Sequence, residues 1–198
     1  IAFGKTLNAG QTCVAPDYVL VPRERIPGFI DAYREAVRRF YPRITGNPDY
    51  TAIISERHRA RLAEMVREAR TAGAQVIEVN PAGEVFNAAS RKLPPTLVIG
   101  APAATRLMRE EIFGPVLPIV EYANLDDALA HVQRNARPLA LYWFGDDASR
   151  CNRALRETVS GGVTINDCLW HLAQESQPFG GVGPSGMGAY HGKWGFDT

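Results

Sequence analysis

The chain has 198 residues, of which 45% are hydrophobic and 22% charged, and its 22 basic and 21 acidic side chains leave a formal net charge of +1. These charges are mixed along the sequence, so neither nucleic acid nor an anionic membrane surface is indicated as a partner. No apolar run reaches the about 18 residues that a membrane-spanning helix needs, and the length suits one domain with a substantial core.

The first half of the chain alternates between strand-like and helix-like segments. Tyr18–Val21 is a short apolar run between two prolines, as expected of a strand. Pro27–Phe40 places its large apolar side chains on one stripe, which predicts an amphipathic helix. A second helix is predicted to begin after Ser55, which is suited to capping, and to stop at Gly73.

The rest of the chain continues this alternation. The predicted elements are strands at 74–79, 95–100 and 116–122, a helix capped by Asn124 or Asp126 and running to Asn135, a strand at 139–145, a helix over Asp147–Thr158 and a strand at 161–167. Strands that alternate with helices predict an α/β fold, with a mostly parallel sheet and helices on both faces.

Cysteine and histidine are few and scattered. Cys13, Cys151 and Cys168 are an odd number at wide spacings, which favours a reducing compartment over a disulfide framework, so we expect a cytoplasmic protein. The four histidines have no metal-binding spacing, and we expect no metal site.

Cys13 lies in a short polar loop, GQTC, just before the first predicted strand. Its small neighbours leave the thiol open to a substrate, and the main-chain N–H groups beside it are free to bind an oxyanion. Cys13 is therefore a candidate nucleophile for attack on a carbonyl carbon. The alternative is a small buried residue near the core.

A second candidate stretch is MREEIFGPVLPIV, residues 108–120. Gly114 and Pro115 predict a turn that directs Glu111 and Phe113 beyond the start of the following strand. A carboxylate there can bind the paired hydroxyls of a ribose, and a ring can pack on a planar heterocycle. The alternative is a solvated acid pair with a core phenylalanine.

Glycine is concentrated in QPFGGVGPSGMGAYHGKWGF, residues 177–196. Such a run indicates close backbone approach or unusual backbone dihedral angles. Its G-x-G spacing matches a phosphate-binding loop only weakly, because no strand clearly precedes it and no helix clearly follows. A structured loop that walls a pocket is the better interpretation.

One series of motifs runs through the chain: GQTCVAPDYVLVP, EEIFGPVLPI, RPLALYWFG and QPFGGVGPSGMGAYHGKWGF. In this order and spacing they resemble the catalytic half of the aldehyde dehydrogenase superfamily. APDYVL, RPLALYWF and PSGMGAYHGK resemble the branch that oxidises fatty, aromatic and coniferyl aldehydes. The resemblance covers essentially the whole chain and implies that residues 1–198 form the catalytic domain of that fold.

The resemblance implies a role for each candidate residue. Cys13 matches the catalytic cysteine, whose thiolate attacks the aldehyde to give a thiohemiacetal and, after hydride transfer to NAD or NADP, a thioester that water hydrolyses to the acid. Glu111 matches the acid that binds the nicotinamide-side ribose, Phe113 the ring beside the nicotinamide, and Phe179 an aromatic residue near the substrate entrance. A small-molecule aldehyde substrate and a homodimer of the full-length enzyme are also expected.

The family's nucleotide-binding half, its oxyanion asparagine and its general-base glutamate precede the catalytic cysteine, whereas only twelve residues precede Cys13 here. We therefore expect that the nucleotide-binding domain is absent from this chain and that the chain is the catalytic domain of a longer polypeptide. The isolated chain is predicted to be inactive.

Two alternatives from other classes stay open at this point. A thiol hydrolase also has a cysteine two residues after a glutamine, as in Gln11-x-Cys13, with His171 or His191 as its base, although the α/β alternation does not suit a papain-like fold. A non-catalytic interaction module is the other alternative, since half of a dehydrogenase can simply bind a partner half.

Overall fold

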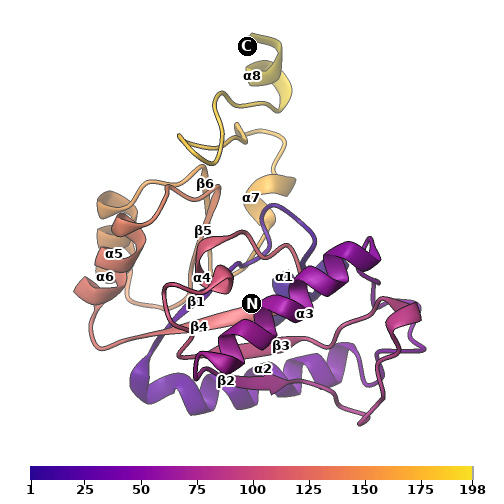
Figure 1. The fold of residues 1–198 in the computed structure, drawn as a ribbon. Coiled ribbons are helices and arrows are strands. Elements are labelled where there is room, and N and C mark those ends of the chain that lie inside the picture. Colours follow the sequence, from indigo (N-terminus) through magenta and orange to yellow (C-terminus); the bar gives the residue numbers. More distant parts are fainter. Residues whose placement is uncertain (198) are drawn as a thin grey trace. The chain divides into compact units, whose positions relative to one another are not determined.

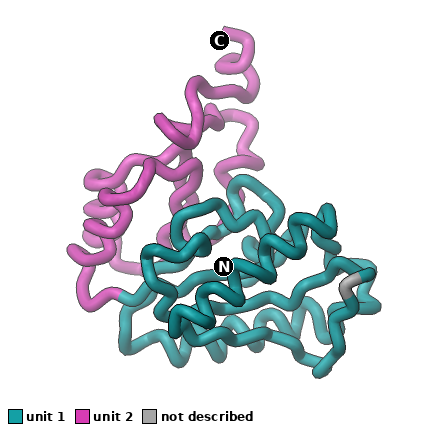
Figure 2. Tube along the Cα trace, in the orientation of Figure 1, with its two compact units in different colours: residues 1–121 teal, residues 122–198 magenta. Residues whose placement is uncertain are grey.

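The protein's structure, a computed structural model, describes residues 1–197, apart from the side chain of Ala88. Two compact units make up the chain, Ile1–Glu121 and Tyr122–Thr198 (Figure 2). That the two together form a single catalytic domain over residues 1–198 remains a prediction.

Unit 1 is built around a four-stranded sheet with the strand order β1-β4-β3-β2 (Figure 1). Strands β3 and β4 are parallel, with Thr96 opposite Val116, whereas β2 pairs antiparallel with β3. The elements are α1 (Ala2–Thr6), η1 (Leu7–Gly10), β1 (Val19–Pro22), η2 (Arg23–Arg25), α2 (Ile26–Phe40), α3 (Glu56–Thr71), β2 (Gln75–Glu78), η3 (Ala88–Ser90), β3 (Thr96–Ile99), α4 (Arg106–Arg109) and β4 (Val116–Tyr122).

Helices α2 and α3 cover opposite faces of this sheet. Alternate residues of a strand point to opposite faces, so β3 directs Leu97 to one side and Val98 to the other. Leu97 belongs to the apolar cluster that contains Tyr33 and Val37 of α2. Val98 belongs to the cluster that contains Leu62, Met65 and Ala69 of α3. The predicted α/β fold with helices on both faces is confirmed.

Side-chain caps fix where α3 and α5 (Leu125–Arg134) begin. Ser55 Oγ accepts a hydrogen bond from His58 N at 3.1 Å and caps α3, as the sequence predicted. Asn124 Oδ1 accepts one from Asp127 N at 3.1 Å, so Asn124 rather than Asp126 caps α5.

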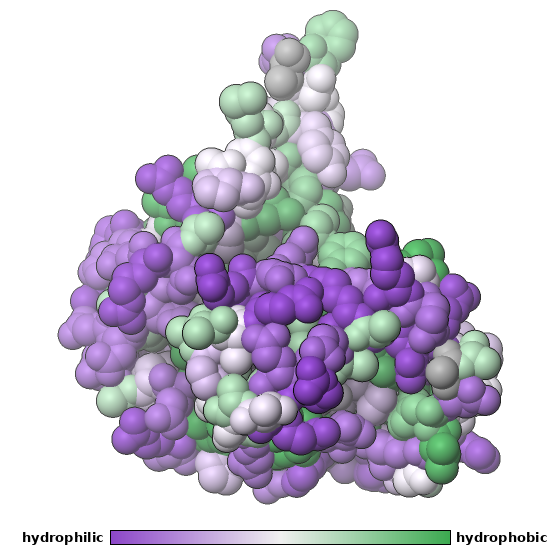
Figure 3. Space-filling view, in the orientation of Figure 1, coloured by the Kyte–Doolittle hydropathy of each residue, from purple (hydrophilic) through white to green (hydrophobic). Residues whose placement is uncertain are grey.

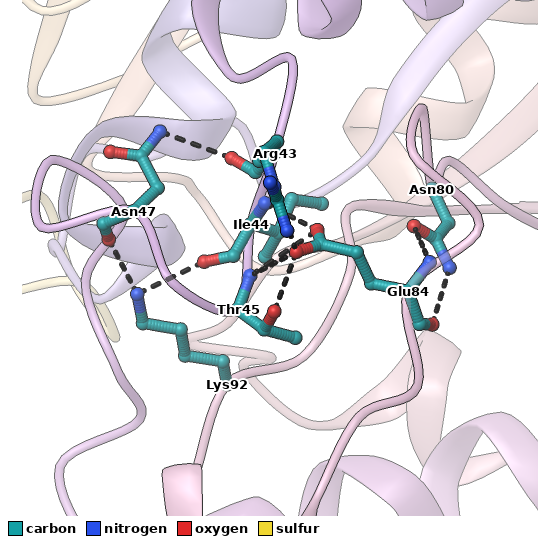
Figure 4. Close-up of polar contacts among 7 residues, drawn as sticks. All are labelled: Arg43, Ile44, Thr45, Asn47, Asn80, Glu84 and Lys92. Carbon is teal, nitrogen blue, oxygen red and sulfur yellow. Dashed lines mark hydrogen bonds and ion pairs between the residues drawn. The ribbon is translucent and has the colours of Figure 1, made fainter.

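A buried carboxylate ties two loops of unit 1 together (Figure 4). Glu84, whose side chain is 7% exposed, accepts hydrogen bonds from Ile44 N (2.5 Å) and from the hydroxyl of Thr45 (2.5 Å). Its own main chain is held by the Asn80 side-chain amide at 2.8 and 3.0 Å. Lys92 Nζ donates to Ile44 O and so closes the same loop from the other side. The segment around Ile44 is therefore fixed without regular secondary structure.

Unit 2 contains a parallel two-stranded sheet, in which Ala140 of β5 lies opposite Gly162 of β6. Asp147 caps α6 by accepting from Arg150 N at 3.0 Å, and Gln133 of α5 donates to Glu157 O of α6 at 2.9 Å. The elements are α5 (Leu125–Arg134), β5 (Ala140–Trp143), α6 (Ala148–Glu157), β6 (Gly162–Ile165), α7 (Trp170–Ala173) and α8 (Gly192–Asp197).

Candidate active site

Cys13 lies in a turn that follows an unusual piece of backbone. Asn8, Ala9 and Gly10 have φ values of 49°, 52° and 73°, three consecutive residues in the left-handed region. Ala15 N then donates to Thr12 O at 3.1 Å and closes a turn around Cys13. The Cys13 thiol is free and exposed, as a nucleophile that must meet a substrate requires.

The segment Glu110–Pro115 lies against this loop. It connects α4 to β4, and a Cβ atom built on Gly10 would lie 2.3 Å from the carbonyl oxygen of Gly114. On the far side of Cys13, Asp17 Oδ1 accepts a hydrogen bond from Ile112 N at 3.0 Å. Two contacts that flank Cys13 in sequence therefore fix its loop against the segment that carries Glu111 and Phe113.

Helix α3 holds the same segment from another direction. Arg61 donates to the carbonyl oxygens of Ile112 (3.0 Å) and Glu111 (2.5 Å). Nε2 of His58 lies 2.7 Å from Phe113 O, and since a carbonyl can only accept, this imidazole carries a proton on Nε2. Phe113 itself has φ = 53°, which bulky residues rarely adopt, so these bonds stabilise a strained conformation.

A pocket of about 450 Å³ opens beside Phe113. Hydrophilic side chains dominate the face of unit 1 over α3 (Figure 3). The pocket itself is mixed, since its lining combines the Phe113 ring and the aliphatic Ile54 side chain with polar and basic groups. It is lined by Ile54, Ser55, Arg57, His58, Arg61, Arg106 and Phe113.

The two adjacent acids of this segment differ in their surroundings. Glu110 forms ion pairs with Arg106 at 2.8 Å and with Arg61 at 3.4 Å, so it belongs to the support of the segment. The Glu111 side chain is exposed, and among the described residues its carboxylate has no hydrogen-bond or ion-pair partner. Glu111 is therefore the acid of the pair that is available to a ligand.

Lys5 is a charged side chain in the core of unit 1, 1% exposed. Burial lowers its pKa to about 8, and the nearby carboxylate of Asp17 opposes that shift. The same Asp17 accepts from Ile112 N, so Lys5 compensates the charge of an anchor of the candidate site. The sequence signal was a lone lysine inside the apolar stretch IAFGKTL, which the prediction did not use.

Phe179 lies in unit 2 and is 6% exposed. Its ring packs against the imidazoles of His171 and His191, each with a ring-centre distance of 5.9 Å. A β-bridge pairs Phe179 with Tyr190 and closes the glycine-rich loop on itself. Thr164 Oγ1 lies 2.9 Å from Nδ1 of His171 and fixes that ring. The role of Phe179 near a substrate entrance remains a prediction.

Other candidate chemistry is sparse. Cys151 and Cys168 are buried, 7% and 2% exposed, and burial raises the pKa of the Cys168 thiol. Within the described residues, no group of three or more His, Cys, Asp or Glu side chains could hold a metal ion. No helix in this part of the chain is both long and apolar enough to cross a membrane.

The aldehyde dehydrogenase family model matches residues 1–198. The chain belongs to the aldehyde dehydrogenase family. It is 54% identical over 194 residues to a probable coniferyl aldehyde dehydrogenase from Caulobacter vibrioides, with 98% of this chain and 40% of that protein covered. The chain thus spans about two fifths of the length of this relative.

Solved structures of aldehyde dehydrogenases have the same fold. The substrate-bound state of Staphylococcus aureus AldH has a TM-score of 0.90 and 41% identity, covering 99% of this chain and 42% of that one. NADP-dependent glyceraldehyde-3-phosphate dehydrogenase from Bacillus halodurans, complexed with NADP, has a TM-score of 0.83 and 26% identity, covering 96% and 39%. Members of the family therefore bind nicotinamide dinucleotides.

Family membership and Gln11 both count against the thiol hydrolase. For Gln11 to take part in such a mechanism, its side-chain amide would need a free N–H group. Here Gln11 Nε2 donates to Asn8 O (3.0 Å) and Ala52 O (3.1 Å), so both of its N–H groups are used.

Proposed function

We propose that this chain is the catalytic portion of an NAD(P)-dependent aldehyde dehydrogenase, with Cys13 as its nucleophile. The observation that carries the proposal is the joining of two segments about a hundred residues apart in sequence. The exposed Cys13 thiol lies on a loop that Gly10 and Asp17 fix against Gly114 and Ile112, and Glu111 belongs to the same segment as these two residues.

The chemistry of this segment fits the nicotinamide end of a dinucleotide. Glu111 has an exposed carboxylate with no partner among the described residues, which suits two ribose hydroxyls. Phe113 presents its ring to a pocket of about 450 Å³, which suits a planar heterocycle. When bound, NAD or NADP supplies the hydride acceptor.

Cys13 carries the covalent steps. Its thiolate attacks the aldehyde carbon, and the carbonyl π electrons move to oxygen, which gives a thiohemiacetal oxyanion that the main-chain N–H of Cys13 can stabilise. Loss of hydride from that carbon, for which a bound dinucleotide would be the acceptor, restores the carbonyl as a thioester. Water then adds to the thioester and expels the thiolate, which releases the carboxylic acid and regenerates Cys13.

The substrate we propose is an aromatic or long-chain aldehyde of the coniferyl aldehyde type. Its support is the 54% identity to the probable coniferyl aldehyde dehydrogenase of Caulobacter vibrioides. We further propose that the nucleotide-binding domain, the second oxyanion donor and the hydrolytic base lie in the part of such enzymes that this chain does not match. The complete enzyme is proposed to be a cytoplasmic homodimer with Phe179 near its substrate entrance.

Steady-state kinetics of the full-length protein tests this function. We expect reduction of NAD or NADP with coniferyl aldehyde at a higher kcat/KM than with acetaldehyde, and loss of that turnover in Cys13→Ala. Full turnover by a folded Cys13→Ala variant would remove the proposed nucleophile. Absence of cofactor reduction with every aldehyde would favour the non-catalytic interaction module instead.

A further inference from the structure

The backbone just before Cys13 is held in a conformation that it would not adopt alone. Asn8, Ala9 and Gly10 are all left-handed, although only glycine adopts this region readily. Ala9 is fully buried, so its surroundings hold it there. Strained backbone persists where neighbouring contacts over-determine it, and it is concentrated at functional sites.

Gln11 supplies the hydrogen bonds that hold the Asn8 end of this turn. Its side chain is largely buried, and the residue is 8% exposed. Nε2 donates to Asn8 O at 3.0 Å and to Ala52 O at 3.1 Å, while Oε1 accepts from Ile54 N at 2.8 Å. The main chain adds two bonds to the strained turn: Gln11 N donates to Asn8 O at 3.1 Å, and Asn8 Nδ2 donates to Gln11 O at 3.0 Å.

These bonds connect the nucleophile loop to a wall of the pocket beside Phe113. Ile54, whose N–H bonds to the Gln11 side chain, is one of the residues that line this pocket. A single buried amide therefore sets the Cys13 loop against the wall where, under the proposed function, the nicotinamide end of the cofactor binds. Effective reaction requires the attacking atom to be held within a fraction of an ångström of its productive place.

We propose that Gln11 is a positioning residue for Cys13: it locks the left-handed turn at residues 8–10 and anchors it to residues 52–54, so that the thiol is presented in one place. The proposal rests on the proposed function for its catalytic consequence. Its structural part, that Gln11 controls the reactivity of the Cys13 thiol, can be measured without turnover.

The test compares variants of the full-length protein. Gln11→Met keeps the volume of the side chain but removes all three of its hydrogen bonds, and Gln11→Asn keeps the amide on a shorter stem. Glu84→Gln is the control. It weakens a different buried anchor of unit 1, the bonds from Glu84 to Ile44 and Thr45, and these bonds do not involve the Cys13 loop. Each variant is assayed for thermal unfolding, for the rate of Cys13 alkylation by iodoacetamide, located by mass spectrometry, and for kcat and KM.

We expect Gln11→Met to slow the alkylation of Cys13 by about tenfold, because the loosened loop no longer presents the exposed thiol in one place. With coniferyl aldehyde, kcat should fall by roughly 100-fold while KM changes much less. Gln11→Asn should lie between Gln11→Met and the wild type, and it supplies the measurement if Gln11→Met does not fold. Glu84→Gln should keep wild-type alkylation and kcat despite a similar loss of thermal stability.

Wild-type alkylation rates in a folded Gln11→Met or Gln11→Asn variant would overturn the proposal, as would an equal fall in Glu84→Gln. A wild-type protein that oxidises no aldehyde would refute the proposed function only. In that case the alkylation rates still decide whether Gln11 positions the thiol.

Discussion

Gly10 and Gly114 are in direct contact, although 103 residues separate them. A Cβ atom on Gly10 would lie 2.3 Å from Gly114 O and 2.9 Å from Lys5 O, distances that van der Waals radii forbid. Gly10 also has φ = 73°, in the left-handed region. Both the close approach and the dihedral angle therefore require glycine at this position.

Gly10→Ala should consequently destabilise the fold by roughly 3 kcal/mol or more, because dihedral strain and overpacking add. The matched control is Gly73→Ala, where φ is 97° but a Cβ atom would meet nothing within 4 Å, so that only the dihedral strain of about 1–2 kcal/mol applies. Urea unfolding of both variants measures the difference. Equal losses would mean that the Gly10–Gly114 contact is unimportant.

Cys13 should be the one thiol whose removal abolishes dehydrogenase turnover in the full-length enzyme. Cys151 and Cys168 are buried and pack as small hydrophobic residues, so Cys151→Ala and Cys168→Ala should retain most of the activity. Steady-state rates and the stoichiometry of thiol alkylation check this. Loss of turnover in a stably folded Cys151→Ala variant would be contrary to the assignment.

Glu111→Gln should affect cofactor handling more than aldehyde binding. If the carboxylate binds two ribose hydroxyls, the variant loses charge-assisted hydrogen bonds worth at most about 1.5–3 kcal/mol each. Titration of cofactor binding by protein fluorescence and single-turnover hydride transfer separate affinity from rate. If neither changes, Glu111 has no role in cofactor binding.

The adjacent acid, Glu110, is not a suitable control for Glu111, because it pairs with Arg106 and Arg61. Removing it would disturb the segment that carries Glu111. Glu64 is the better control, because it pairs with Arg67 on the exposed side of α3. Glu64→Gln should leave cofactor affinity and hydride transfer unchanged.

Periodicity and capping residues accounted for the longer elements of this fold. Helices α2, α3, α5 and α6 and strands β1 to β6 lie within two residues of the predicted segments, because each combines an apolar stripe or run with a clear stop signal. Very short helices such as α1 and α4 gave no signal, since a few residues cannot show a period. The antiparallel pairing of β2 with β3 was not predictable either, because a strand's sequence does not specify the direction of its partner.

The sequence also pointed to some residues of the candidate site and not to others. Cys13, Glu111 and Phe113 were predicted from the sequence, because motif chemistry and resemblance point to them directly, and their roles remain predictions. Asp17, His58 and Arg61, which support them, were not found. Each contacts main-chain atoms 50 to 95 residues away, and such bonds leave no local pattern in the sequence.

Glu84 should make the unfolding free energy of unit 1 depend on pH in the acid range. Hydrogen bonds from Thr45 and Ile44 lower the pKa of this carboxyl below its ordinary value of 4.5. A pKa that falls on folding means that the ionised group stabilises the fold above pH 4.5 and that this contribution is lost as the pH drops through the folded-state pKa.

Glu84→Gln should therefore lose about 1.5–3 kcal/mol of unfolding free energy at pH 7, and the difference from the wild type should shrink as the pH falls toward 3. Denaturant unfolding at several pH values measures both effects. A difference that is constant or larger in acid would be inconsistent with a stabilising carboxylate. Glu64→Gln, at an exposed ion pair, should change little at any of these pH values.

The chain of residues 1–198 alone should not oxidise aldehydes. Hydride transfer needs the nicotinamide in contact with the carbon bound to Cys13, and that placement supplies much of the rate. Glu111 and Phe113 offer a dinucleotide only the contacts for its nicotinamide end.

The test uses the purified chain of residues 1–198, first checked for folding by circular dichroism. It is mixed with coniferyl aldehyde and either NAD or NADP, and the absorbance of the reduced cofactor is compared with that produced by the full-length enzyme. Cys13 in this chain should still react with iodoacetamide, because its loop is held by contacts within unit 1. Turnover comparable to that of the full-length enzyme would show that residues 1–198 contain a complete dinucleotide site, and Glu111 and Phe113 would then be only part of it.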